Sequence, residues 1–448
     1  MFTTVKTGSV YVRRRRMAAL VAACCAVLML VGMWQIGRAA ASTLARLAGP
    51  AKTSPAATPS PRATTTAARS ASPTTVPSGL QSPALRSSST LRGATPSSSA
   101  TASTTPAAPA LPADQTRLRL TQRITGSLTP KSVAIAQSGI ALVPNTLGRH
   151  SISVFRADGR RVTEISDAVR LAEHGIAGHP GTSRGNPFEV AFSPDGRTAF
   201  VASYSMSGAG FTSPGADACT TRDRVSASFV YQVDVSSLKV TRVLPAGESP
   251  KHLAVTPDGK RVLVANWCSD DLSVIDIASG AEITRVGLGG HHPRGIAVTR
   301  DSRTAFVALM ASDEIVRVDL GALRATPLSS PGGGPRDLLM APDGRSLIVA
   351  QNGLSAVSRV ALPGGSTADT VDVGAQPRAM AMSSDGRAVY VVTYAGGEVV
   401  KLRASDLTVL GRVRVDARPV GVSYDPVGHR VWVACESGSV LVLDDSRR

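Results

Sequence analysis

The chain has 448 residues and a formal net charge of +17, from 49 Lys and Arg against 32 Asp and Glu. That balance would suit a nucleic-acid-binding protein, but residues 1–113 contain twelve Lys or Arg and no acidic residue, which leaves only +5 of the +17 for the rest of the chain. Aromatic residues make up 4% of the sequence, so few side chains are available to stack on bases. Composition therefore argues against nucleic-acid binding.

The first predicted element is a membrane helix. Residues 17–37 carry no charge and are long enough to cross a bilayer. The basic run Arg13–Arg16 precedes them, so the positive-inside rule places residues 1–16 in the cytoplasm. We expect residues 17–37 to be an uncleaved signal anchor, because the apolar core of a cleaved signal peptide is usually shorter. Cleavage after Ala41 and lipid attachment at Cys24 are the alternatives.

Residues 49–113 are predicted to form a disordered stalk. They are almost all Pro, Ser, Thr and Ala, with a few Arg. Such a segment cannot bury enough apolar surface to fold. Its Ser, Thr and Pro content is typical of stalks that carry O-linked sugar. The stalk would hold the following domain clear of the membrane on its extracytoplasmic side.

A pattern of about 42 residues recurs over residues 115–448. Each copy begins with a Pro, which is followed eight residues later by an Asp or its substitute in a turn, as in Pro335 and Asp343. The turn is often Asp-Gly, which favours a hairpin between the apolar runs on either side of it. The marker prolines are Pro130, Pro187, Pro250, Pro293, Pro335, Pro377 and Pro419. Seven repeats of four short strands predict an all-β fold, a seven-bladed β-propeller.

The repeat register also predicts how the ring closes. The last repeat starts at Pro419 and has only three predicted strands, the third at residues 439–445. Residues 116–124 precede the first repeat and have the character of its missing fourth strand. We expect this N-terminal strand to complete the last blade, because the closure hides two sheet edges.

One repeat resembles a known family. The segment "PDGKRVLVANWCSDDLSVIDIASG" at residues 257–280 is similar to the YVTN β-propeller repeat. Its "VLVAN" block at 262–266 stands for the Tyr-Val-Thr-Asn block of the family, and "LSVIDIASG" for the third strand and turn. The resemblance covers about residues 115–448. It implies a propeller of the surface-layer-protein type, exposed or secreted, and it implies no catalytic residues, since the family shares none.

The residue after the marker proline provides the candidate site. It is basic in five of the seven repeats, at Lys131, Lys251, Arg294, Arg336 and Arg378. Each of these residues starts an inner strand, so together with His252 and His292 they are predicted to form a basic funnel at the channel mouth. Converging cations would concentrate the field on an anionic small molecule or glycan. The alternative is that each basic residue is structural and pairs within or between blades.

Two insertions and two cysteines fall at the same end of the predicted ring. The insertions are residues 166–186 and 205–228, and long loops on one rim often bind ligands. Cys219 lies in the second insertion, and Cys268 lies in the equivalent loop of the next repeat. We expect a disulfide between them, because the space outside the membrane is oxidising. Cys435 is expected to be a buried thiol.

The sequence indicates a non-catalytic role. It contains no HExxH, GxSxG or phosphate-loop motif, and His174 and His179 lack a metal-ligand spacing, so no metal or cofactor is expected. We predict a membrane-anchored binding or scaffold module of the cell envelope whose partner is an anionic molecule, a glycan or another envelope protein. The alternative is an enzyme, because residues 334–352 are similar to lactonase repeats. However, Asp337 stands where such enzymes often carry His.

Overall fold

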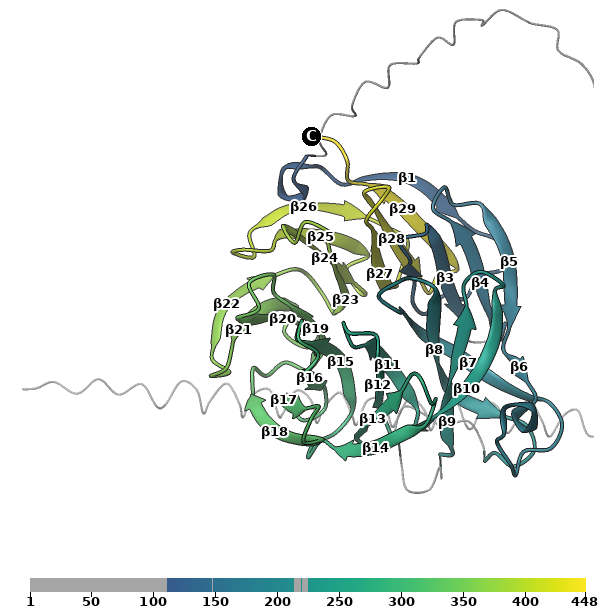
Figure 1. Cartoon of the computed structure of the whole chain (residues 1–448). Helices are drawn as coiled ribbons and strands as arrows, with labels where there is room; N and C mark the ends of the chain where they lie inside the picture. Colours follow the sequence, from purple (N-terminus) through teal and green to yellow (C-terminus); the bar gives the residue numbers. More distant parts are fainter. Residues whose placement is uncertain (1–110, 147, 213–218, 220–224) are drawn as a thin grey trace, which may run out of the picture. The chain divides into compact units, whose positions relative to one another are not determined.

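The computed structural model describes residues 111–448 apart from 147, 213–218 and 220–224. These residues form seven antiparallel sheets arranged in a ring around a central axis (Figure 1), so the prediction of a seven-bladed propeller is confirmed.

The described residues contain no α-helix, and none of their helical segments is long and apolar enough to cross a bilayer. Their two short 3-10 helices are η1 (Ala113–Gln115) and η2 (Leu171–His174). The predicted cytoplasmic segment 1–16, the anchor 17–37 and nearly all of the stalk 49–113 lie outside the described residues.

The blades follow one another along the chain. Blade one contains β2 (Ala134–Ile135), β3 (Ile140–Asn145), β4 (Ser151–Arg156) and β5 (Arg161–Ser166). Blade two contains β6 (Ala168–Val169), β7 (Ser183–Phe192), β8 (Thr198–Ser207), β9 (Ala227–Asp234) and β10 (Lys239–Glu248). Blade three contains β11 (Pro250–Val255), β12 (Arg261–Asn266), β13 (Asp271–Asp276) and β14 (Glu282–Gly287). Blade four contains β15 (Pro293–Val298), β16 (Thr304–Leu309), β17 (Glu314–Asp319) and β18 (Arg324–Ser329).

The remaining blades continue this order. Blade five contains β19 (Pro335–Met340), β20 (Ser346–Gln351), β21 (Ala356–Ala361) and β22 (Thr367–Asp372). Blade six contains β23 (Pro377–Met382), β24 (Ala388–Thr393), β25 (Glu398–Arg403) and β26 (Val409–Arg414). Blade seven contains β27 (Pro419–Asp425), β28 (Arg430–Cys435), β29 (Ser439–Asp444) and the N-terminal strand β1 (Arg119–Ile124).

Strand β1 closes the ring. It pairs antiparallel with β29, with Arg119 opposite Asp444 and Ile124 opposite Val440. Figure 1 shows the N-terminal strand beside the C-terminal one. The predicted closure is therefore confirmed, and it gives β29 a partner on the edge that would otherwise face solvent.

The core lies between blades. The second strand of a blade is buried on both faces, as in β20 and β24, where all six residues are buried. The fourth strand is at the rim, and β22 is exposed at five of six positions. Neighbouring blades share their apolar clusters, so Val357 of blade five packs in the same cluster as Val391 of blade six. A fully buried Val contributes roughly 1.5 kcal/mol or more, so each blade depends on its neighbours.

The turns between the first and second strands have the chemistry that the sequence predicts. Asp343 Oδ1 accepts a hydrogen bond of 2.8 Å from the Arg345 backbone N–H, and Gly344 between them has φ +67°. A side chain at that position would be strained, which explains the recurrent Asp-Gly. Ser302 replaces Gly in blade four and accepts the same conformation, with φ +59°.

Blade two differs from the others because its first insertion is built into the sheet. Residues 166–186 were predicted as a loop, but they contain β6 and η2, and β6 pairs with the start of β7. The strands β7 and β8 continue beyond the usual blade height, with Arg184 opposite Ser207. The physical reason is burial: Leu171 and Ile176 of the first insertion pack on the core cluster of blade two.

Candidate functional site

A β-bulge positions the residue after each marker proline. In blade three, Pro250 pairs with Asn266 and His252 with Ala265, so Lys251 between them has no partner in the ladder. The same one-residue shift occurs at Phe188, Arg336, Arg378 and Val420, and blade four has a wider one over 294–295. A bulge redirects a side chain and increases the local twist. Here it places the extra residue at the end of the blade where the inner strand begins.

The predicted basic residues are gathered at this end of the channel. Arg294, Arg336 and Arg378 line one cavity. Arg294 Nη1 donates a hydrogen bond of 3.3 Å to the Lys251 backbone carbonyl. Lys131 and Arg294, from blades one and four, lie 5.4 and 5.2 Å from the centre of the same Phe188 ring. The structure therefore brings together all five basic residues that the repeat register singles out.

Most of these cations also contact a second ring of side chains. Lys251 Nζ is 3.6 Å from the centre of the Trp267 ring, and Arg378 Cζ is 3.6 Å from that of Tyr394. An aromatic face stabilises a cation without cancelling its formal charge.

Arg336 and Lys131 have different partners in that second ring. Arg336 Nη1 is 3.6 Å from Met310 Sδ. Lys131 Nζ pairs with Glu436, which also accepts a hydrogen bond of 2.8 Å from the Tyr394 hydroxyl. Burial lowers the pKa of Lys131, and the bond to Glu436 opposes that effect. Lys131 is therefore the member of the ring that best fits the structural alternative.

Sequence reasoning missed this second ring. Six members directly follow the second strand of their blade, and Tyr204 lies within the longer β8; the members are Thr146, Tyr204, Trp267, Met310, Asn352, Tyr394 and Glu436. The signal was available, because three of these seven positions are aromatic in a chain where aromatic residues are scarce. We call the five cations and this second ring together the channel mouth.

Below the cations the channel contains a cavity of about 80 Å³. Its polar side chains are those of Glu189, His252, Arg294, Arg336, Asp337 and Arg378. A water molecule takes about 30 Å³ in the liquid, so the cavity has room for a small oxyanion or for the charged end of a larger ligand. Glu189 and His252 keep 21% and 23% of their side-chain surface exposed, so both are reachable from the cavity.

The acidic groups of this channel cavity titrate near neutrality. Burial raises the pKa of Glu189 to about 7; Arg294 opposes this and Asp337 adds to it. Burial raises the pKa of Asp337 to about 6, although its carboxylate accepts hydrogen bonds from the backbone N–H groups of Met380 (2.7 Å) and Leu338 (2.9 Å). The cavity can therefore both donate and accept protons near pH 7.

The predicted histidines have different roles. His252 lies 3.9 Å from Glu189 Oε2. Burial and the nearby Arg294 and Arg336 lower its pKa to about 3, so it adds no positive charge to the funnel. His292 stacks on Trp267 at 4.1 Å between ring centres. Among the described residues, no group of His, Cys, Asp or Glu is arranged to hold a metal ion.

Cys219 of the second insertion and Cys268 of blade three form a disulfide. Their Cα atoms are 5.1 Å apart. Cys268 directly follows Trp267, so the bond attaches the second insertion beside the channel mouth. Cys435 is a buried free thiol.

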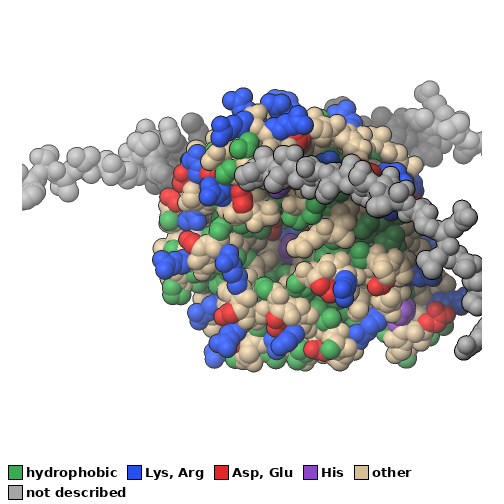
Figure 2. All heavy atoms as spheres, turned by 45° about the horizontal axis from the view of Figure 1, so that its top comes forward, with side chains coloured by type: hydrophobic (Ala, Val, Ile, Leu, Met, Phe, Trp, Pro, Cys, Tyr) green, Lys and Arg blue, Asp and Glu red, His purple; other side chains and the backbone are tan. Residues whose placement is uncertain are grey.

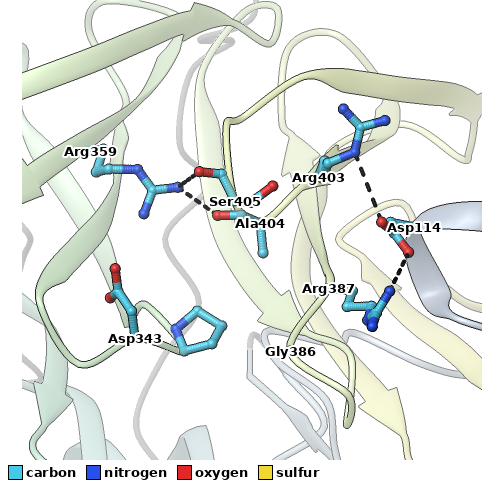
Figure 3. A pocket seen from close by; sticks show the side chains of 9 residues that line it. Asp114, Asp343, Arg359, Gly386, Arg387, Arg403, Ala404 and Ser405 are labelled. Atoms are coloured by element: carbon cyan, nitrogen blue, oxygen red, sulfur yellow. Dashed lines mark hydrogen bonds and ion pairs between the residues drawn. The ribbon is translucent and has the colours of Figure 1, made fainter.

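A separate pocket of about 380 Å³ lies at the opposite ends of the strands, between blades five and six (Figure 3). Its arginines hold structural contacts. Arg359 donates hydrogen bonds to the carbonyls of Ala404 and Ser405, and Arg387 lies 3.8 Å from the Asp114 carboxylate. The contact between Asp114 and Arg387 attaches η1 to blade six.

The face shown in Figure 2 is not uniformly basic. On the face shown in Figure 2, Lys and Arg side chains are interspersed with Asp and Glu and with apolar side chains. The grouping of five cations at the channel mouth therefore does not simply reflect a uniformly basic surface.

No family model and no curated protein matches this sequence. Solved structures do. A chain of Kuenenia stuttgartiensis hydrazine synthase has a TM-score of 0.57 and 18% identity, and the match covers 72% of this chain and 98% of that one. Virginiamycin B lyase from Staphylococcus aureus has a TM-score of 0.55 and 14% identity, with coverage of 73% and 99%. At these identities the likeness shows the propeller fold alone, and the resemblance to the YVTN family stays an expectation.

Proposed function

We propose that this protein is a non-catalytic binding module of the cell envelope whose propeller binds an anionic ligand at the channel mouth. The observation that carries the proposal is the convergence of cations from five different blades at the channel mouth, three of which, Arg294, Arg336 and Arg378, line one cavity. Cations at the opening of a low-dielectric channel attract anions and raise their local concentration.

Among the groups named here from the described part of the chain, the cations at the channel mouth outnumber the carboxylates. The cations at the mouth number five, and the carboxylates in contact with them or below them are Glu189, Asp337 and Glu436. The named groups therefore carry an excess of two positive charges even when every carboxylate is ionised. Protonation of Glu189 or Asp337 increases that excess.

The test measures anion binding to purified full-length protein by calorimetry. The probes are sulfate, dextran sulfate and polygalacturonate, which separate a free oxyanion from a sulfated or a carboxylated polymer. We expect binding that weakens with added salt, because exposed charges are screened over about 8–10 Å at physiological ionic strength. Arg294→Gln with Arg336→Gln should weaken binding at least about tenfold, since each lost bond to a charged group is worth about 1.5–3 kcal/mol.

A matched control keeps the net charge equal. Arg317→Gln with Arg324→Gln also removes two positive charges, but from exposed positions on β17 and β18 of blade four. This control should bind anions like the unmodified protein. Equal losses in both double variants, or a parent protein that binds none of the three probes, would reject a specific anion site at the channel mouth.

The location is part of the same proposal. We infer that residues 17–37 anchor the chain and that the propeller lies on the extracytoplasmic side, because Arg13–Arg16 precede the apolar segment. Protease added to intact cells should release the propeller by cutting within residues 49–113. A propeller that is cut only after the membrane has been opened would contradict this topology.

An enzyme is the second candidate, and the channel cavity favours it. Burial raises the pKa of Glu189 to about 7 and that of Asp337 to about 6, and a neutral His252 lies beside Glu189. A general acid or base works best with a pKa near the working pH. A lactonase-like reaction would appear as hydrolysis of lactones or esters that Glu189→Gln abolishes without weakening anion binding. If none of a broad panel of lactones and esters is hydrolysed, the enzyme hypothesis is rejected and the binding module is the remaining proposal.

A further inference from the structure

We propose that Glu189 is a ligand-binding residue of the channel cavity, and that its carboxyl group donates a hydrogen bond to an oxyanion held by Arg294 and Arg336. This inference rests on the proposed function and narrows it. The ligand would then be a carboxylate, sulfate or phosphate group with hydrogen-bond-accepting oxygens, and not an anion in general.

The position of Glu189 in the ring supports this role. It follows the bulged Phe188 on β7 and lines the same cavity as the three arginines. The equivalent position is His252 in blade three and Asp337 in blade five, and in the other blades it is small or has no side chain, as at Gly295 and Gly421. A Cβ at Gly295 would lie 2.6 Å from the Asp337 Cα, which shows how closely the inner strands approach there. Glu189 is thus one of the few side chains that reach the cavity at this level.

The groups that face Glu189 determine its protonation. They are Ser132 before β2, His252 on β11, Arg294 on β15, Arg336 and Asp337 on β19, and Arg378 on β23. Lys131 lies next to Arg294 and Arg378 at the mouth above them. His252 is neutral, so the charges nearest to Glu189 are the arginines and a second carboxylate. The Asp337 carboxylate disfavours ionisation of Glu189, and an incoming anion would disfavour it further.

A carboxyl that is half protonated near neutrality can become a hydrogen-bond donor at little cost. Burial raises the pKa of Glu189 to about 7. An ionised Glu189 would repel a bound oxyanion, whereas the protonated form donates to it, so binding should take up a proton. The oxygens of the ligand would then accept hydrogen bonds from guanidinium groups and from a neutral carboxyl group. A spherical anion has no separate oxygens with which to accept these directed hydrogen bonds.

The experiment titrates sulfate into full-length protein at pH 6, 7 and 8, in pairs of buffers with different ionisation enthalpies. Sulfate is used because it does not change protonation in this range. With a pKa of about 7, Glu189 is mostly protonated at pH 6 and mostly ionised at pH 8, so sulfate binding should weaken about tenfold between them. Calorimetry should show uptake of close to one proton per sulfate at pH 8. Dextran sulfate should show the same coupling if the natural source is a polymer.

Glu189→Gln separates this inference from the proposed function. Gln keeps the shape and an N–H donor, so the variant should bind sulfate at pH 8 within about threefold of its affinity at pH 6, and its proton uptake should fall. The control Glu248→Gln removes a carboxyl whose pKa burial also raises, but which lies outside the cavity, and it should keep the pH dependence. Sulfate binding that is independent of pH, or proton uptake that survives in Glu189→Gln, would reject the role of Glu189 and leave the anion site intact. No sulfate binding at any pH would reject both.

Discussion

The buried pair between Lys401 and Asp445 provides a sharp test of how the ring is closed. Lys401 on β25 donates hydrogen bonds to Asp445 Oδ1 (2.5 Å) and to Thr116 Oγ1 (2.8 Å). The two charged side chains keep 2% and 0% of their surface exposed. Thr116 precedes β1 and Asp445 follows β29, so one ammonium group joins the two ends of the described chain to blade six. Tyr390 also donates to Asp445.

Changing Lys401 to Met should destabilise the propeller strongly. The substitution preserves the length of the apolar stem but leaves the Asp445 carboxylate buried without its cation. Breaking a buried pair in this way typically costs about 3–5 kcal/mol. Arg403→Met on the same strand is the matched control, because Arg403 is 37% exposed and its partners Asp406 and Asp114 are 49% and 19% exposed. Ion pairs at the surface contribute about 0–1 kcal/mol.

The assay is denaturant unfolding followed by tryptophan fluorescence. Trp432 on β28 is fully buried in the closing blade and is a local probe. The double variant Lys401→Met with Asp445→Asn removes both charges and should recover part of the loss, as expected for coupled residues. If Lys401→Met stays within about 1 kcal/mol of the unmodified protein, or if Arg403→Met costs as much, the buried pair does not hold the closure.

Two further predictions concern stability. A carboxyl group whose pKa is higher in the folded than in the unfolded protein stabilises the fold at pH values below its unfolded pKa. That stabilisation is lost as the pH rises through the folded pKa. For Glu189 the loss occurs between pH 4.5 and about pH 7. Glu189→Gln should therefore raise the melting temperature at pH 8 and change it little near pH 4.5, and a larger gain at low pH would contradict the sign. Reducing the Cys219–Cys268 bond, which spans 49 residues of sequence, should lower the free energy of unfolding by about 4 kcal/mol in the chain-entropy model, and a Cys219→Ser, Cys268→Ser variant should no longer respond to reductant.

The architecture was predictable because the repeat is regular. The spacing of 42 or 43 residues between the last five marker prolines defines the repeat from which the blades are counted. Counting strands in the last repeat was enough to predict that β1 pairs with β29. Blade two was less predictable. The insertion at residues 166–186 has no repeat to compare with, and its short strand β6 forms because the long β7 offers it an edge.

The candidate site was predicted in part. The five cations share one repeat position, so their convergence follows from ring symmetry once the blades are counted. The contacts of these cations do not follow from the repeat. The rings of Trp267 and Tyr394 belong to a different repeat position, and only the folded structure brings that position next to the cations. Glu189 and Asp337 were hidden for another reason. Acidic residues are common in the turns, and only burial in the cavity distinguishes these two.

The repeat itself argues against a purely structural reading of the basic ring. The bulge after the marker proline is present in blades two and seven, where the bulged residues are Phe188 and Val420. The backbone therefore adopts this geometry without a basic side chain, so the strand does not require the cations found in the other five blades. Lys131 has a structural partner in Glu436. Arg294, Arg336 and Arg378 line one cavity with Glu189, and grouping like charges around a channel costs folding free energy. The chemistry of the ring thus points to the cavity that it surrounds, and Glu189 is the residue whose change should alter the ligand preference of that cavity while leaving the blades in place.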